Sequence, residues 1–154
     1  MTETFDNGGY LTLQIRLLNG RLFNRLLAAD GRALYSAEQG KILSSLWKWA
    51  PMTATDLALK TGLANNTLTA MLKRLEDKGL IKSSSHPKDK RKRLFDLTEL
   101  GRSQEEVGAE VSQQLDAIFY KGFSQAERAE VEGYLMRILQ NLQEVEDSER
   151  WKKV

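Results

Sequence analysis

The residues best suited to chemistry fall in two short stretches, a polar segment at residues 65–73 and a basic segment at residues 86–93. In the first, asparagine and threonine side chains recur at helical spacing. An amide can pair with both edge atoms of adenine, and a threonine methyl can touch a thymine methyl. In the second, five basic side chains lie within six residues, a composition that neutralises phosphates. Together these residue types indicate contact with double-stranded DNA.

The charge of the whole chain supports the same interpretation because it is unevenly spread. The formal net charge of the 154 residues is only +2. Residues 60–102 carry eleven basic and five acidic side chains, whereas residues 103–154 carry six and eleven. A basic segment on a near-neutral protein predicts a polyanion that is contacted by one face. The alternative for a basic run alone is a solvated loop.

The sequence contains few residues that could support catalysis, redox chemistry or metal binding. The chain has no cysteine, and its one histidine, His86, lies in the basic segment. A Cys-His or Ser-His-Asp site would need residues that are missing or this one loop histidine. No glycine-rich phosphate loop and no cluster with metal-ligand spacing is visible. We therefore expect a protein that is not an enzyme and needs no cofactor. We also expect it to be cytoplasmic, without a membrane partner, since neither a signal-peptide pattern nor an apolar span is present.

Two helices joined by a short glycine-containing turn are predicted to position the polar segment. The first begins near Thr53 and ends at Gly62. The second runs from Asn65 to Lys78, with Asn65 or Asn66 as its N-cap. Its inward face is expected to hold Leu68, Met71, Leu72 and Leu75. This is the pattern of a helix-turn-helix.

A β-hairpin is predicted to carry the basic segment. Its strands are residues 80–84 and 93–97, and residues 85–92 form a polar tip that includes Pro87. A helix-turn-helix followed at once by a basic hairpin predicts a winged helix. Arg91 is the candidate for insertion into a narrow minor groove. Asp89, which phosphate repels, is expected to hold Arg91 or the loop in shape.

The predicted DNA contacts therefore fall into two groups. On the helix they are Asn65, Asn66, Thr67, Thr69, Ala70 and Lys73, and on the wing they are Lys88, Lys90, Arg91, Lys92 and Arg93. For Asn65 and Asn66, the alternative is that one of them only caps the helix.

Long helices with broad apolar stripes are predicted at both ends of the chain. One covers residues 10–29, a second runs from Thr98 to about Lys121, and a third follows the capping box of Ser124 and Glu127 and frays from Asp147. The simplest way to bury the stripes is an intertwined homodimer, which presents two recognition helices to a palindromic duplex. Five aromatic side chains fall near the junction of these helices with the winged helix: Tyr10, Phe23, Tyr35, Trp47 and Trp49. Plain core packing is the preferred interpretation, and a pocket for an apolar ligand is the alternative.

Several motifs resemble those of the MarR/SlyA family of winged-helix transcriptional regulators. They are Ser36-Ala-Glu-Gln, Thr55-Asp-Leu-Ala, Asn66-Thr-Leu-Thr, Arg74-Leu-Glu-Asp-Lys-Gly-Leu-Ile81, Asp89-Lys-Arg91 and Leu97-Thr-Glu-Leu-Gly-Arg102, in the order and spacing of the family. The resemblance implies a homodimer, a recognition helix in each of two major grooves, and Arg91 in the minor groove. It also implies repression or activation of nearby genes, often relieved by a small aromatic or phenolic ligand.

Two departures from the family pattern concern the recognition helix. Ala70 stands where many members carry arginine, so base recognition is expected to shift to Asn65, Asn66 and Thr69. Ala64 stands where a serine cap is common. Without cysteine, the peroxide-sensing thiol of one branch of the family cannot operate.

The expected fold is mainly α with a small β-hairpin wing. It divides into an N-terminal dimerisation helix (1–34), a winged helix-turn-helix DNA-binding domain (35–100) and C-terminal dimerisation helices (101–154). The expected function is a sequence-specific DNA-binding regulator, a homodimeric repressor released by a small aromatic effector. The alternative is a winged-helix adaptor that binds proteins without sequence-specific DNA binding.

Overall fold

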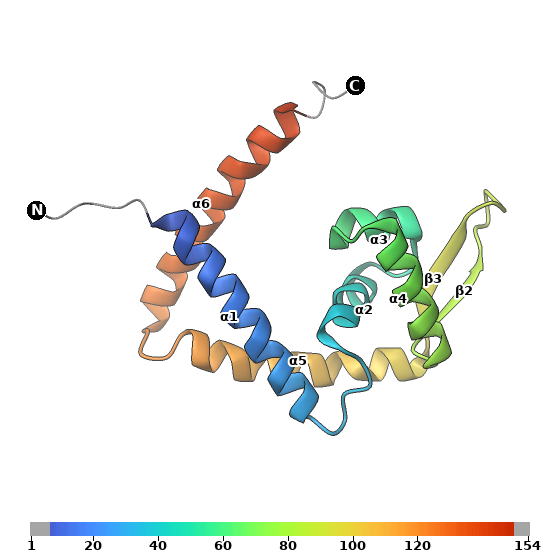
Figure 1. Cartoon of the computed structure of the whole chain (residues 1–154), viewed down its shortest axis with the longest axis horizontal. Helices are drawn as coiled ribbons and strands as arrows, with labels where there is room; N and C mark the ends of the chain where they lie inside the picture. The colour runs from blue at the N-terminus through green and yellow to red at the C-terminus, as the bar shows by residue number, and fades with distance from the viewer. Residues whose placement is uncertain (1–6, 150–154) are drawn as a thin grey trace, which may run out of the picture. The chain divides into compact units, whose positions relative to one another are not determined.

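The computed structural model describes residues 7–149, which form helices and one small antiparallel sheet (Figure 1). The elements in order are α1 (Gly8–Ala29), α2 (Ala37–Trp49), β1 (Met52–Thr53), α3 (Ala54–Thr61), α4 (Asn65–Asp77), β2 (Ile81–Ser85), β3 (Arg93–Leu97), α5 (Glu99–Phe119) and α6 (Gln125–Glu149). The predicted fold class, mainly α with a hairpin wing, is confirmed. The chain divides into two compact units, the first ending at Asp116 and the second beginning at Ala117.

The winged helix lies within the first unit. Helices α2, α3 and α4 pack with a sheet of strand order β1-β3-β2, in which Ile81 pairs with Leu97 and Ser85 with Arg93. Strand β1 is missing from the sequence prediction, because two residues carry no detectable alternation and Met52 becomes a strand only by pairing with Phe95. The fully buried side chains at the centre are mainly leucines and isoleucines: Ile42, Leu43, Leu46, Leu57, Leu75 and Leu80.

Local capping signals start three of the helices. Ser36 with Gln39 and Thr53 with Asp56 form complete capping boxes before α2 and α3. Before α6, the Ser124 hydroxyl accepts from the Glu127 N–H at 3.1 Å, and a Glu127 carboxylate oxygen accepts from the Ser124 N–H at 2.9 Å. These predicted helix starts are confirmed.

The start of α4 differs from the prediction. Ala64 is the N-cap, with extended backbone (φ −64°, ψ 148°), and no side chain caps the helix. The Ala64 carbonyl accepts from the Leu68 N–H at 2.9 Å, which makes Asn65 the first helical residue. Neither Asn65 nor Asn66 is therefore the cap, and the absent cap costs α4 about 1 kcal/mol. Both amides are exposed instead.

Helix α6 also ends later than predicted. It continues through Asp147 to Glu149, so the expected fraying from Asp147 is wrong for these three residues. The rest of that segment lies outside the described residues. Continued hydrogen bonding explains the longer helix, because residues such as Glu144 and Glu146 have good helical propensity.

Two glycines let α5 lie against the winged helix. A Cβ on Gly101 would lie 2.0 Å from the Leu80 carbonyl oxygen, and a Cβ on Gly108 would lie 2.7 Å from the Tyr35 hydroxyl. The Trp47 indole N–H donates to the Gly101 carbonyl at 2.9 Å. The first half of α5 is thus fixed to the core by close contacts that a larger residue cannot make.

Candidate nucleic-acid interface

Helix α4 separates its side chains cleanly into a buried and an exposed face. Leu68, Leu72 and Leu75 are buried, as the helical period predicts. The six predicted contacts on this helix are all exposed: Asn65, Asn66, Thr67, Thr69, Ala70 and Lys73. The first turn contains no acidic residue, so the positive end of the helix dipole is not neutralised there. The exposed face therefore offers amides, hydroxyls and one lysine to an anionic partner.

The hydroxyl group of Thr69 already makes a hydrogen bond within α4. Its hydroxyl donates to the Asn65 carbonyl at 2.8 Å, one turn back along α4. Because this bond fixes the side-chain rotamer, the methyl group has a defined direction. Thr69 is therefore better placed for apolar contact than for donating a hydrogen bond to a base.

The wing loop is ordered around Asp89. Its carboxylate accepts from the Arg91 backbone N–H at 3.1 Å and from the Arg91 Nε at 3.2 Å. These hydrogen bonds, the side-chain one first, hold the pKa of Asp89 below its ordinary value. The predicted role of Asp89 in holding Arg91 is confirmed. His86 contributes only locally, since its Nδ1 accepts from the Lys88 N–H at 3.1 Å.

The five cations of the wing are exposed, but they do not share one role. The Arg91 side chain is 91% exposed, although its backbone N–H and its Nε both donate to Asp89. Arg93 reaches back across the hairpin and donates to the Ser83 hydroxyl at 2.6 and 3.2 Å. Lys88, Lys90 and Lys92 make no salt bridge within residues 7–149 and are available to a solvent-side partner.

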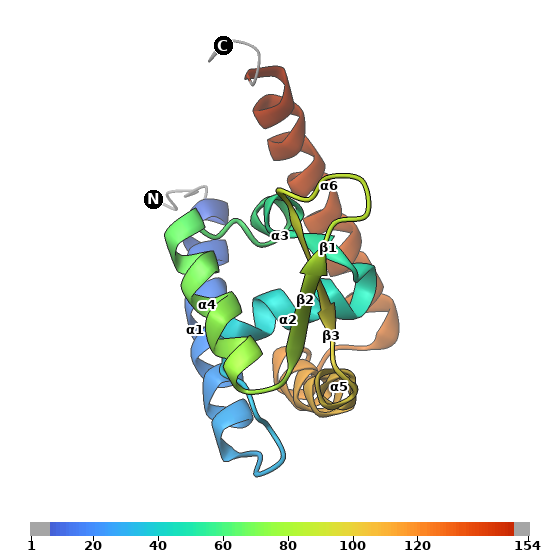
Figure 2. The ribbon, with the colours of Figure 1, turned by 90° about the vertical axis from the view of Figure 1, so that its right-hand side faces the viewer.

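The helix and the wing lie next to one another in the first unit. Figure 2 looks onto α4 and the β2–β3 hairpin, which run side by side. The first residues of α4 and the tip of the hairpin both lie toward the top of that view. The predicted contacts on the first turns of α4 and on the loop thus belong to the same end of the winged helix.

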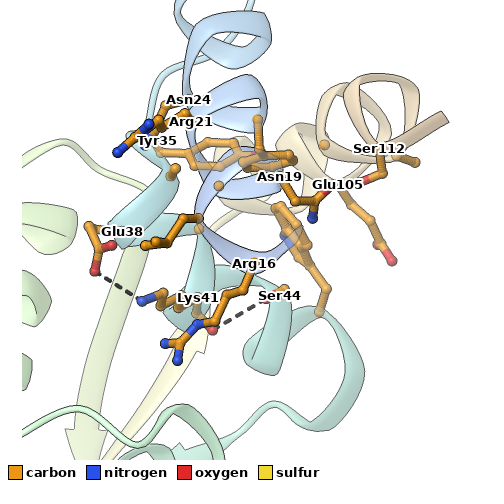
Figure 3. A pocket seen from close by; sticks show the side chains of 18 of the residues that line it. Arg16, Asn19, Arg21, Asn24, Tyr35, Glu38, Lys41, Ser44, Glu105 and Ser112 are labelled. Carbon is orange, nitrogen blue, oxygen red and sulfur yellow. Dashed lines mark hydrogen bonds and ion pairs between the residues drawn. The ribbon is translucent and has the colours of Figure 1, made fainter. Parts of the chain in front are cut away.

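A cleft of about 960 Å³ lies between α1, α2 and the first half of α5 (Figure 3). Three of the five aromatic side chains singled out from the sequence line it, namely Phe23, Tyr35 and Trp47. The rings of Tyr35 and Trp47 meet edge to face, with centroids 5.9 Å apart. Tyr10 and Trp49 are exposed and do not line the cleft.

Charged and polar groups line the same cleft. Arg16, Arg21 and Lys41 contribute cations, and Lys41 pairs with Glu38 at 3.2 Å, a contact drawn as the dashed line between these two side chains in Figure 3. Burial, with a smaller contribution from Asp30, raises the pKa of Tyr35, so its phenol stays protonated at neutral pH. The two arginines are not recognisable from the sequence as cleft residues, since charged positions on a helix of this kind are normally solvated. The cleft thus combines aromatic rings with cations and hydroxyl groups.

Neither a candidate metal site nor a membrane-spanning helix is present in the part of the chain that the structure describes. Residues 7–149 contain no group of three histidine or acidic side chains able to hold a metal ion. None of their helices is long and apolar enough to cross a membrane.

Comparison with known proteins identifies the fold. The model of the MarR family matches residues 35–92. No curated protein sequence matches the chain. The structure of the reduced form of MarR from E. coli is similar at a TM-score of 0.74 and 30% identity, covering 90% of this chain and 99% of that one. The chain belongs to the MarR family.

Further solved structures agree with the MarR-family assignment. A cysteine-to-serine mutant of MarR from E. coli complexed with operator DNA matches at a TM-score of 0.75 and 29% identity, over 90% of this chain and 99% of that one. A probable transcriptional regulator from Pseudomonas aeruginosa matches at 0.73 and 25%, over 86% and 97%. The MarR family and these neighbours are transcriptional regulators, and the predicted family is confirmed.

Proposed function

We propose that the chain is a sequence-specific transcriptional regulator that binds double-stranded DNA in the cytoplasm as a homodimer on a palindromic operator. The observation that carries the proposal is the exposed polar face of α4 beside a basic wing whose Arg91 is held by Asp89. The E. coli relative complexed with operator DNA supports the choice of partner. Residues 35–100 would contact DNA, and residues 1–34 and 101–154 would form the dimer.

The proposed contacts divide into base recognition and phosphate binding. Asn65, Asn66 and Thr69 on α4 would reach base edges in the major groove, with Thr67 and Ala70 beside them, and Lys73 would reach a phosphate or a guanine. Arg91 would enter the minor groove. Lys88, Lys90, Lys92 and Arg93 would bind phosphates, which fix the register without reading sequence.

The homodimer is supported by apolar side chains on α1 and α6 that no part of their own unit covers. On α1, Leu11, Leu13 and Leu18 are each at least half exposed, and on α6 the same holds for Leu142 and Val145. Exposed leucines that recur along one helix are typical of a surface that another protein covers. A second copy that covers these stripes would give the two-fold symmetry that a palindrome requires.

The proposed effector is a small aromatic molecule bound in the cleft of Phe23, Tyr35 and Trp47. Aromatic rings favour edge-to-face and stacked contacts with such a ligand. The protonated Tyr35 hydroxyl would donate a hydrogen bond to it. Repression is the proposed sign of regulation, because a dimer bound across a promoter excludes other proteins from that duplex.

Selection of duplexes from a random DNA pool at near-physiological salt tests the proposal. Enrichment of a palindrome with half-sites about one helical turn apart is the expected result. Salt-sensitive binding without enrichment would refute sequence-specific recognition and favour the winged-helix adaptor. A reporter behind the selected palindrome then tests repression, since expression should fall when the protein is present.

A further inference from the structure

The C-terminal end of α4 is tied to α2 by one side chain. Lys78, the C-cap of α4, donates from Nζ to Gln39 Oε1 at 2.7 Å. Gln39 is only 7% exposed, and the same oxygen accepts from the Ser36 N–H at 3.1 Å. One carbonyl oxygen therefore serves both the capping box of α2 and the end of the DNA-facing helix.

The first turn of α2 is also a wall of the cleft. Ala37, Glu38, Gly40 and Lys41, on both sides of Gln39 in the chain, line the cavity. The Gly40 N–H donates to the Ser36 carbonyl at 2.8 Å, so the turn is closed by its own hydrogen bond. Because a hydrogen-bonded turn moves as one piece, a displacement of this wall displaces Gln39 as well.

The opposite wall reaches the same end of α4. Helix α5 lines the cleft with Glu105 and Gly108. Thr98, just before α5, donates from its hydroxyl to the Gly79 carbonyl at 2.6 Å and from its N–H to the Leu80 carbonyl at 3.1 Å. The chain that leaves α4 is therefore held by α5 on one side and, through Lys78, by α2 on the other.

We propose that the Lys78–Gln39 hydrogen bond couples the cleft to the orientation of α4, with Lys78 as a positioning residue for DNA binding. The inference rests on the proposed function. A molecule that shifts the first turn of α2 relative to α5, while Trp47 keeps its bond to Gly101 at the other end of α2, pulls on the two attachments of α4 in different directions, so α4 must turn or release one of them. Of the two attachments, the bond to Gln39 is a single side-chain contact, and its ammonium donor makes it stronger than a neutral hydrogen bond.

Coupling between two sites is reciprocal, which allows a test without any effector. If the cleft biases α4, then DNA bound to α4 must change the stability of the cleft wall. The amides of Gln39 and Gly40 report that stability, because their N–H groups are bonded to the Ser36 hydroxyl and carbonyl. Their hydrogen exchange measures how often the first turn of α2 opens.

The experiment compares hydrogen exchange of residues 36–41 with and without saturating amounts of the selected duplex. The full-length variants are Lys78→Met, which keeps the aliphatic stem without the charge, and Lys78→Arg, which keeps a donor. Lys82→Met is the matched control, since Lys82 is an exposed lysine on β2 whose side chain makes no hydrogen bond or ion pair within residues 7–149. Saturation removes any effect of a variant on affinity from the comparison.

Duplex binding is expected to change the exchange rate by about fivefold or more in the wild type, Lys78→Arg and Lys82→Met, and by less than about twofold in Lys78→Met. An equal change in Lys78→Met and the wild type would overturn the inference. Unchanged exchange in a wild-type protein that has bound the duplex would overturn it too. If no duplex binds the wild type, the proposed function fails and this inference fails with it.

Discussion

Replacement of Gly101 by alanine is expected to destabilise the protein, although alanine is the better helix former. A Cβ at this position would lie 2.0 Å from the Leu80 oxygen, 3.0 Å from the Leu80 carbonyl carbon and 3.2 Å from Leu97 Cδ2. Two of these atoms belong to the backbone and cannot rotate away. Helix α5 or the chain after α4 must therefore move by about 1 Å to relieve the contact.

The expected size of the effect follows from what this movement disturbs. Overpacking of a tight contact costs about 1–3 kcal/mol. The bonds from the Thr98 N–H to Leu80 and from the Trp47 indole to Gly101 are weakened, at about 1 kcal/mol each when lost. The higher helical propensity of alanine relative to glycine stabilises α5 by about 1 kcal/mol and offsets part of this loss. If both bonds are lost, the free energy of unfolding should thus fall by about 2–4 kcal/mol.

Urea denaturation followed by circular dichroism measures the change, at one fixed protomer concentration because dimer stability depends on it. Gly133→Ala in α6 is the matched control, since a Cβ there meets no atom of its own chain within 4 Å. The control should be neutral or more stable by up to about 1 kcal/mol. A Gly101→Ala protein as stable as the wild type would refute the argument that α5 docks through this glycine.

Four further outcomes are expected. Arg91→Ala should weaken binding to the selected duplex while the mass in light scattering stays that of a dimer, and unchanged affinity would count against the minor-groove role. Lys90→Ala should weaken binding to all sequences alike and lower the salt slope by about one unit, whereas a sequence-selective loss would contradict phosphate binding. The pKa of Asp89 should lie below about 3.9 in an NMR titration and rise when Arg91 is replaced. Its contribution to loop order is then present above that pH and lost as the pH falls through the lowered pKa, and an equal pKa in both proteins would refute the pairing. Leu18→Asp should shift the protein to monomer mass in light scattering, because a charge would enter the proposed interface, and a persistent dimer would place that interface elsewhere.

The parts of the fold that sequence analysis predicts well are those determined by nearby residues. A capping box needs only residues three apart, so the boxes at Ser36 and Ser124 are visible in the sequence. Gly62 and Gly79 adopt positive φ values of 72° and 75°, and both mark predicted helix ends. The buried stripe of α4 follows from the helical period alone.

The parts that it misses depend on residues far apart in the chain. Strand β1 exists only because β3 pairs with it, and the Lys78–Gln39 contact joins residues 39 positions apart. Ala64 is the N-cap although two asparagines, which have the stronger capping preference, follow it directly, so residue preference alone points to the wrong position. Whether an arginine on α1 is solvated or lines a cleft likewise depends on where α2 and α5 pack.

The two glycine contacts of α5 also limit how relatives of this protein could be recombined. Gly101 and Gly108 are about two helical turns apart and face the same side of the helix. One residue inserted between them would rotate one contact by about 100° relative to the other, so the helix could not satisfy both. Chimaeras that graft the arms of one family member onto the winged helix of another should therefore have their junction outside residues 101–108. The wing loop at 86–92, by contrast, contains no fully buried side chain, so a change in its length would alter the proposed DNA contacts without disturbing the packing of the core.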